Sequence, residues 1–278
     1  MFLRCGSHSL DLSTPLVMGV LNVTPDSFSD GGSFASVEGA VSRGLQMIEE
    51  GAGLIDVGGE STRPGAQAVG AEEEIGRVVP VIEALAARTQ VPISVDTSKA
   101  AVMTAAVRSG ASMINDVRAL REPGALDAAA NTQAAICLMH MQGEPRTMQA
   151  DPLYGDVVAE VRDFLRERAA VCRASGIEQD RLLIDPGIGF GKRLEHNLAL
   201  LAGLPALAAL GWPVLVGVSR KSMFGALLGR SVDERIAGGV AAVTAAVLAG
   251  VSMVRTHDVA ATVDAVKVAI ALRDAGYR

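Results

Sequence analysis

Short apolar segments alternate with longer, helix-like segments along almost the whole chain, and this alternation limits the folds open to it. The apolar segments are continuous rather than alternating, which is typical of parallel strands buried on both faces. Eight of them recur, at residues 16–21, 53–57, 93–95, 113–114, 134–139, 182–184, 214–218 and 251–254. Segments with helical spacing follow at residues 37–50, 72–87, 99–108, 156–174, 195–209, 233–248 and 260–274, and a short helix is expected within 121–131.

Eight strand–helix repeats favour an α/β fold of the closed (β/α)8 type, a TIM barrel, over an open doubly wound sheet. The length of 278 residues fits one such domain over residues 1–278, since these barrels typically take about 250 residues. Residues 1–14 stand outside the repeat and predict a short N-terminal β-hairpin that closes one end of the barrel. Glycines where helices are expected to end lie at positions 51, 110, 176, 211 and 250.

Composition excludes some classes of partner. The formal net charge is −6, which argues against a general nucleic-acid or membrane-surface binder. Residues 197–218 and 236–254 are uncharged, but the first is interrupted by Pro205 and Pro213 and the second consists mostly of Ala, Gly and Val. We therefore expect a soluble protein. Without a signal peptide or presequence at its N-terminus, it is expected in the cytoplasm.

Three cysteines, Cys5, Cys137 and Cys172, show neither metal-like nor redox-like spacing. An odd number in a chain expected in the cytoplasm indicates reduced structural thiols rather than disulfides.

Polar residues stand at or directly after the ends of the apolar segments. In a (β/α)8 barrel the carboxyl ends of all strands meet at one mouth, where the chemistry takes place. A single polar residue there is often a turn former or a helix cap, but eight groups together point to a site. These groups are Asn22; Asp56 with Glu60; Asp96; Asn115 with Asp116; His140; Asp185; Ser219 with Arg220 and Lys221; and Arg255 with Thr256 and His257.

The residues at the strand ends divide by chemistry. Asp96, Asn115 and Asp185 offer carboxylate and amide groups that can pair with the N–H and C=O edge of a heterocycle. Asp56 lies within an apolar segment, so it needs a partner: a metal-bound water, a neighbouring cation or a ligand N–H. The groups suited to a phosphate are Arg63, Arg220, Lys221, Arg255 and His257.

Three apparent motifs lack the neighbouring residues or the position that their usual function requires. The glycines of GIGFGK at residues 187–192 lack the spacing of a phosphate loop and the first-strand position of a dinucleotide motif. They favour a tight turn beside a ligand held by Asp185. His140 and His196 have no paired zinc ligands, and Ser219 lacks the G-x-S-x-G elbow of a serine hydrolase. Long segments at residues 24–36, 61–71 and 141–152 are expected to be functional loops.

The phrases at these strand ends resemble those of the bacterial dihydropteroate synthases from the first strand to the last. They are MGVLNVTPDSFSDGG, DVGGESTRPGA, SVDTSK, INDV, LMHMQGEPRTMQ, DPGIGFGK, GVSRKSMFG and VRTHDV, at residues 18–32, 56–66, 94–99, 114–117, 138–149, 185–192, 217–225 and 254–259.

The resemblance implies the condensation of 7,8-dihydropterin-6-ylmethyl diphosphate with 4-aminobenzoate, and a role for each site residue. Lys221, Asp96, Asp185, Arg255 and His257 are expected to be catalytic. The pterin is expected to meet Asp96, Asn115, Asp185 and Lys221, and the diphosphate to meet Thr62, Arg63, Arg255 and His257. The expected 4-aminobenzoate pocket comprises Phe28, Pro64, Phe190, Ser219 and Lys221. The cofactor is expected to be Mg²⁺ on the diphosphate, held by Asn22 with Asp56 nearby.

The resemblance also implies a homodimer whose only substrates are small molecules, and the Ala- and Val-rich segments 238–248 and 260–270 could supply its apolar face. Departure of diphosphate before attack by the weakly nucleophilic amine, an SN1-like course, is a hypothesis. Two alternatives remain open: a pterin-binding methyltransferase domain that uses methyltetrahydrofolate, and a non-catalytic pterin-binding paralogue.

Overall fold

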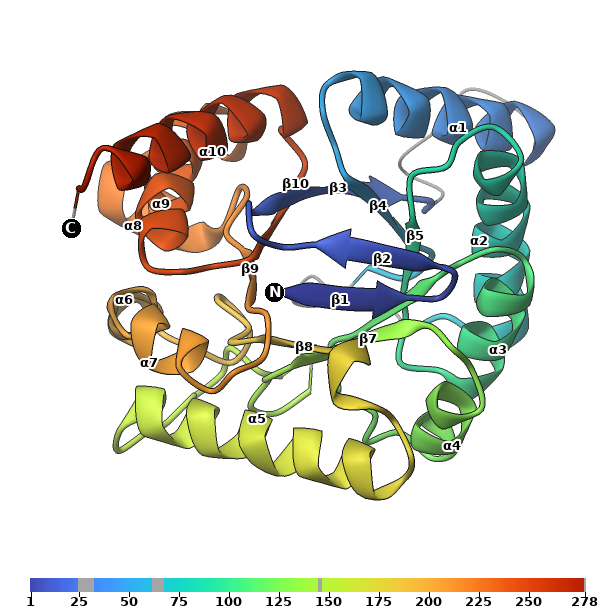
Figure 1. Cartoon of the computed structure of the whole chain (residues 1–278), viewed down its shortest axis with the longest axis horizontal. Coiled ribbons are helices and arrows are strands. Elements are labelled where there is room, and N and C mark those ends of the chain that lie inside the picture. Colours follow the sequence, from blue (N-terminus) through green and yellow to red (C-terminus); the bar gives the residue numbers. More distant parts are fainter. Residues whose placement is uncertain (25–32, 62–67, 145–146, 278) are drawn as a thin grey trace.

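A computed structural model describes residues 1–24, 33–61, 68–144 and 147–277. Its centre is a barrel of eight parallel strands enclosed by helices (Figure 1). The hydrogen-bonded order is β8-β7-β6-β5-β4-β3-β10-β9, and a parallel bridge between Ile184 and Val214 joins the two outer members. The strands are β3 (Leu16–Asn22), β4 (Leu54–Gly58), β5 (Ile93–Asp96), β6 (Met113–Asp116), β7 (Ala135–Met139), β8 (Leu182–Asp185), β9 (Leu215–Gly217) and β10 (Met253–Thr256). The predicted (β/α)8 barrel is confirmed.

Helices connect the strands and cover the outside of the barrel (Figure 1). They are α1 (Ser33–Glu49), α2 (Ala71–Ala86), α3 (Ala100–Arg108), α4 (Ala125–Ala130), α5 (Val157–Ala174), α6 (Leu194–Ala202), α7 (Leu204–Ala208), α8 (Ser222–Leu228), α9 (Ile236–Leu248) and α10 (Val259–Asp274). Asp156 caps α5, because its carboxylate accepts the N–H groups of Val158 and Ala159.

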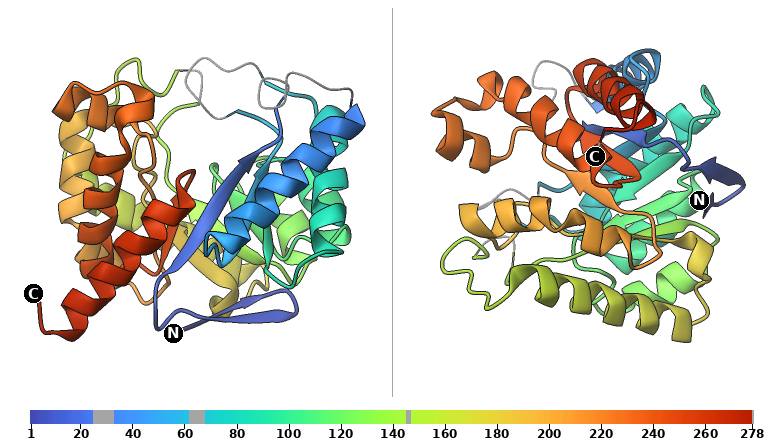
Figure 2. Two further views of the ribbon diagram at one scale, coloured as in Figure 1. Left: turned by 90° about the horizontal axis from the view of Figure 1, so that it is seen from above. Right: turned by 60° about the vertical axis from the view of Figure 1, so that its left-hand side comes forward.

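The N-terminal hairpin consists of β1 (Phe2–Cys5) and β2 (His8–Asp11), joined by a turn at Gly6 with φ of 61°. Figure 2 shows it at the end of the barrel from which β3 starts. Leu3 and Cys5 pack there with the lower interior residues of the barrel, among them Met18, Leu54 and Met113. The hairpin therefore seals the amino-terminal end, as the sequence predicts, and leaves the carboxyl ends of the strands as the mouth.

The five glycines predicted to end helices all have positive φ, from 86° at Gly211 to 116° at Gly110. Two helix predictions were wrong in detail. The segment 195–209 is divided into α6 and α7, because Gly203 ends one helix and Pro205 lies at the start of the next. Helix α8 was missed, since its seven residues lie directly behind the polar end of β9 and show too few turns for a helical period.

The two uncharged segments are internal parts of the barrel: they contribute buried side chains from α6, α7, β9, α9 and β10. Among the described residues, no helix is both long and apolar enough to cross a membrane. All three cysteines are buried and free, as expected.

Candidate active site

Arg255 on β10 bridges two carboxylates at the mouth of the barrel. Its Nε lies 2.6 Å from Oδ2 of Asp56 on β4, and its Nη2 lies 2.7 Å from Oδ2 of Asp96 on β5. The side-chain amide of Asn115 on β6 donates to the same oxygen of Asp56 over 3.0 Å. Asp56 is fully buried, and Arg255 is the neighbouring cation that was one of its expected partners.

Burial sets the electrostatics of this cluster. Removal from water raises the pKa of Asp96 to about 7; Arg255 opposes this rise, whereas the nearby carboxylate of Asp56 adds to it. Burial lowers the pKa of Arg255, but Asp56 and Asp96 outweigh that effect and raise the pKa above its usual range. The second carboxylate oxygen of Asp56 is buried without a hydrogen-bond partner among the described residues.

Asp185 and Lys221 act on each other electrostatically beside this cluster. Asp185 ends β8 and accepts the N–H of Gly187 over 2.7 Å. Burial raises its pKa to about 6, against the effects of that hydrogen bond and of Lys221. Burial lowers the pKa of Lys221 to about 8, while Asp185 raises it and Arg255 lowers it further. The ammonium nitrogen of Lys221 lies 4.0 Å from the ring centroid of Phe190, which is a cation–π distance.

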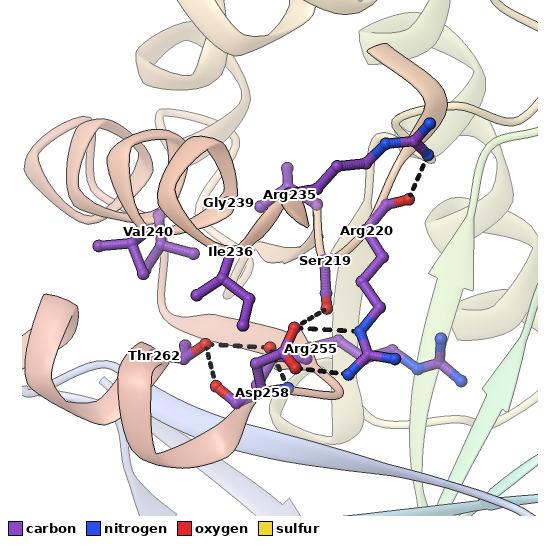
Figure 3. A pocket seen from close by; sticks show the side chains of 12 residues that line it. Ser219, Arg220, Arg235, Ile236, Gly239, Val240, Arg255, Asp258 and Thr262 are labelled. Atoms are coloured by element: carbon purple, nitrogen blue, oxygen red, sulfur yellow. Dashed lines mark hydrogen bonds and ion pairs between the residues drawn. The ribbon is translucent and has the colours of Figure 1, made fainter. Parts of the chain in front are cut away.

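Ser219, after β9, and His257, after β10, lie in contact at the ends of two paired strands. Figure 3 shows the Ser219 hydroxyl directed toward Asp258, which also meets Arg220. The ring Nδ1 of His257 lies 3.1 Å from the hydroxyl of Ser219, which also accepts the backbone N–H of His257. The hydroxyl donates to Asp258 over 3.4 Å, and the guanidinium of Arg220 donates to the same carboxylate over 2.6 and 3.2 Å. Arg220, which the sequence grouped with the phosphate donors, therefore pairs with Asp258.

Other polar strand-end residues stabilise turns. Asp116 accepts the hydroxyl of Ser98 and the N–H groups of Arg118 and Leu120. Thr256 accepts the N–H of Asp258 over 3.1 Å. For Asp116 and Thr256 the simpler interpretation, turn formation or capping, is the one that the geometry supports.

Lys192 has no role predicted from the sequence. It is 3% exposed. Its ammonium nitrogen lies 2.9 Å from Nδ1 of His140, from the carbonyl of Gly187 and from that of Phe190. The signal for Lys192 in the sequence is a lysine at the end of a glycine-rich turn, in a motif that lacks the spacing of a phosphate loop.

Asn22 is the last residue of β3 and lies beside the charged cluster. A Cβ atom added at Gly58 would lie 3.7 Å from the amide oxygen of Asn22 and 3.5 Å from Cβ of Asp96. The structure thus brings together the predicted residues on β3, β4, β5, β6, β8 and β10. Phe28, Thr62, Arg63 and Pro64 lie outside the described residues.

The chain is similar to known proteins over almost its whole length. Residues 18–257 match the family model described as pterin binding enzyme. The chain is 55% identical to a dihydropteroate synthase of Escherichia coli strain K12, over 94% of this chain and 92% of that protein. The fold is similar to the dihydropteroate synthase of Xanthomonas albilineans with 4-aminobenzoic acid, at 56% identity, a TM-score of 0.92 and coverage of 98% of each chain. A structure of the same enzyme with 7,8-dihydropteroate has 52% identity and a TM-score of 0.89, covering 98% of this chain and 99% of that one.

The raised pKa of Asp185 predicts a pH-dependent stability. A carboxyl group with a raised pKa in the folded state stabilises the fold below its unfolded pKa, and this contribution is lost as pH rises through about 6. The free energy of unfolding should therefore fall between pH 5 and 7.5. In Asp185→Asn this fall should be smaller by roughly 1 kcal/mol. Urea denaturation at the two pH values measures this. Asp264→Asn, at an exposed position on α10, is the control, and equal slopes for both variants would contradict the assignment.

Proposed function

This chain belongs to the pterin-binding enzyme family and, within it, to the dihydropteroate synthases. From that membership we propose which part of the reaction each site residue performs. The enzyme is a transferase that condenses 7,8-dihydropterin-6-ylmethyl diphosphate with 4-aminobenzoate, giving 7,8-dihydropteroate and diphosphate. The observation that carries the proposed roles is the convergence of Asp96, Asn115 and Asp185 with Lys221 at one mouth of the barrel.

The carboxylates and the amide are proposed to hold the pyrimidine edge of the pterin. Asp96 and Asp185 offer oxygens that can accept the ring N–H groups, and Asn115 adds an amide whose orientation Asp56 fixes. The raised pKa values of both carboxyl groups reflect burial without enough donors. A ligand that supplies N–H donors would relieve part of this cost.

The cationic side of the mouth is proposed to receive the diphosphate. Arg255 and His257 would contact its oxygens, together with Thr62 and Arg63 from outside the described residues. Arg255 is held by two carboxylates, so its guanidinium is oriented before the substrate arrives. Such preorganised charge stabilises the anion that develops on the leaving group.

Mg²⁺ is proposed to bind mainly through the diphosphate. The described residues contain no cluster of three or more His, Cys, Asp or Glu side chains that could hold a metal. This agrees with an ion that keeps its waters and takes substrate phosphate oxygens with only one or two protein ligands. The amide oxygen of Asn22 would be that ligand, with Asp56 acting indirectly, and the ion would neutralise charge on the leaving diphosphate.

The second substrate is proposed to bind at the outer edge of the mouth. Phe190 and the side chain of Lys221 would form one wall. The hydroxyl of Ser219, two residues before Lys221, would be a partner for the carboxylate of 4-aminobenzoate. Phe28 and Pro64, outside the described residues, are proposed to complete the pocket.

We propose that the bond to diphosphate breaks before the amine attacks. The C–O bond of the pterin methylene breaks, diphosphate leaves with the electron pair, and the aryl nitrogen forms the new C–N bond and then loses its proton. The anionic groups Asp96 and Asp185 beside the pterin would favour the positive charge that develops on the methylene carbon.

A homodimer is proposed to form through helix α9. This helix has no charged residue in its 13 positions, and Ile236, Ala237, Ala241 and Ala245 are exposed on it. Leu227 and Leu228 on α8 are 47% and 52% exposed. An apolar surface of this kind is typical of an interface between subunits.

Product formation tests the function. Incubation with the pterin diphosphate, Mg²⁺ and 4-aminobenzoate should release diphosphate and form dihydropteroate in equal amounts, and chelation of Mg²⁺ should slow the reaction. Lys221→Met should lower kcat/KM by on the order of 100-fold, whereas the exposed Lys267→Met should not. Methyl transfer from methyltetrahydrofolate, or pterin binding without turnover, would instead support one of the alternatives.

The order of bond changes can be tested with substituted anilines. If diphosphate leaves first, single-turnover rates should change little as the amine becomes more basic. A steep rise of the rate with basicity, measured by rapid quench at saturating amine, would show that the amine takes part in the rate-limiting step.

The dimer can be tested by sedimentation. Ala241→Glu should convert it to a monomer, because a charge would be buried in the interface without a partner. Leu153→Glu, at an exposed apolar residue between β7 and α5, should leave it a dimer. An unmodified chain that sediments as a monomer at micromolar concentration would refute the proposal.

A further inference from the structure

Lys192 connects two loops at the barrel mouth that are distant in the sequence. Its ammonium nitrogen contacts Nδ1 and the carbonyl oxygen of His140, which follows β7, at 2.9 and 3.3 Å. It also contacts the carbonyls of Gly187 and Phe190, in the turn after β8, at 2.9 Å each. Three donor hydrogens thus meet four acceptors inside the protein.

The energetics of this contact favour a fixed position. Burial lowers the pKa of Lys192 to about 7, against the effect of Asp185. A buried amino group is costly unless its hydrogens are bonded, and here the hydrogens have acceptors in either protonation state. Burial lowers the pKa of His140 to about 3, so its ring is neutral and its Nδ1 can accept a hydrogen bond from Lys192. The ring is also held edge-on by Phe164, with centroids 4.9 Å apart. The position of Lys192 is therefore set from several sides.

The turn over residues 186–191 has no room to shift toward β7. A Cβ atom at Gly187 would lie 1.9 Å from the carbonyl oxygen of His140, and one at Gly191 would lie 2.2 Å from that of Gln142. Backbone therefore packs directly on backbone, and Lys192 holds the two sides together. The hydroxyl of Tyr154 adds a further bond, to the carbonyl of Gly191 over 2.8 Å.

The same turn touches the reacting groups. The N–H of Gly187 donates to Asp185, and Phe190 lies beneath the ammonium group of Lys221. Gly189 lies against the Lys221 side chain, where an added Cβ would be 3.1 Å from Cδ. Any displacement of this turn would move Asp185, Phe190 and Lys221 relative to one another.

We propose that Lys192 is a positioning residue: its buried ammonium group fixes the turn over residues 186–191, and thereby the place and the hydration of the Lys221 ammonium group. As a role in the pterin condensation, the inference rests on the proposed function. Lys192 itself touches neither substrate in this scheme. It acts through Phe190, Gly189 and Gly187.

The experiment compares Lys192→Met with Lys267→Met, in which the same change is made at an exposed site on α10. Lys192→Met keeps an unbranched apolar stem, one atom shorter, and removes the donors. Its kcat/KM for 4-aminobenzoate should fall on the order of 10- to 100-fold, since small displacements of catalytic groups have effects of this size. The loss should exceed the change in affinity for the pterin diphosphate, because Asp96 and Asn115 lie on other strands. Lys267→Met should match the unmodified protein in both.

A second readout does not depend on turnover. The sequence has four lysines, Lys99, Lys192, Lys221 and Lys267, so side-chain NMR can follow the titration of Lys221. Its pKa of about 8 should rise by one unit or more in Lys192→Met, because a displaced turn admits water and reduces the desolvation that lowers it. Asp185, Asp96 and Arg255 are unchanged in both variants. Lys192 and Lys221 also repel each other, so the shift in Tyr154→Phe, which removes no charge, reports the hydration of the turn by itself.

Tyr154→Phe is a milder variant that keeps the test decisive where Lys192→Met fails to fold. Loss of one hydrogen bond to the turn should raise the KM for 4-aminobenzoate about threefold and move the Lys221 pKa in the same direction. A folded Lys192→Met with unchanged kinetics and an unchanged Lys221 pKa would overturn the proposal, as would an unchanged Tyr154→Phe if Lys192→Met does not fold. Absence of dihydropteroate with the unmodified protein would refute the proposed function alone, because the Lys221 titration would still report on the positioning role.

Discussion

The fork of Arg255 between Asp56 and Asp96 is the interaction on which the mouth of this barrel depends. It brings together β4, β5 and β10, and through Asp56 it also orients Asn115 on β6. Two carboxylates this deeply buried would repel each other without the guanidinium, and the guanidinium would be too costly to bury without them. The cluster is possible because a closed parallel barrel directs the carboxyl ends of all its strands to one place.

Burial at the mouth of the barrel raises the pKa of carboxyl groups and lowers the pKa of the lysine amino group. It raises the pKa of Asp96 to about 7 and that of Asp185 to about 6, and it lowers that of Lys221 to about 8. Groups whose ordinary pKa values differ by more than six units thereby come within about two units of each other. Clusters with such shifted values are typical of catalytic sites, because near neutral pH both protonation states are accessible. Lys192 belongs to the same environment, yet its hydrogen bonds go to backbone carbonyls and His140 rather than toward the mouth.

Much of the fold could be predicted because its signals are local. Continuous apolar segments mark strands buried on both faces, and Gly51, Gly110, Gly176, Gly211 and Gly250 end helices because they adopt positive φ. The predictions failed where local signals were weak or mixed. Helix α8 is too short to show a period, and the break between α6 and α7 depends on Gly203 and Pro205 within one apolar segment.

The barrel, its sealed end and the set of polar residues at its mouth could be predicted from the amino-acid sequence, because strand ends and helix ends are encoded by neighbouring residues. Which of those residues pair depends on the three-dimensional fold. Arg255 binds Asp56, which lies 199 positions earlier in the sequence. Arg220 pairs with Asp258, and Asp116 stabilises a turn. The contacts of Lys192 could not be predicted either, since one of its partners, His140, follows another strand 52 positions earlier in the sequence. Burial and ion pairing depend on how distant segments come together, and a linear pattern does not record this.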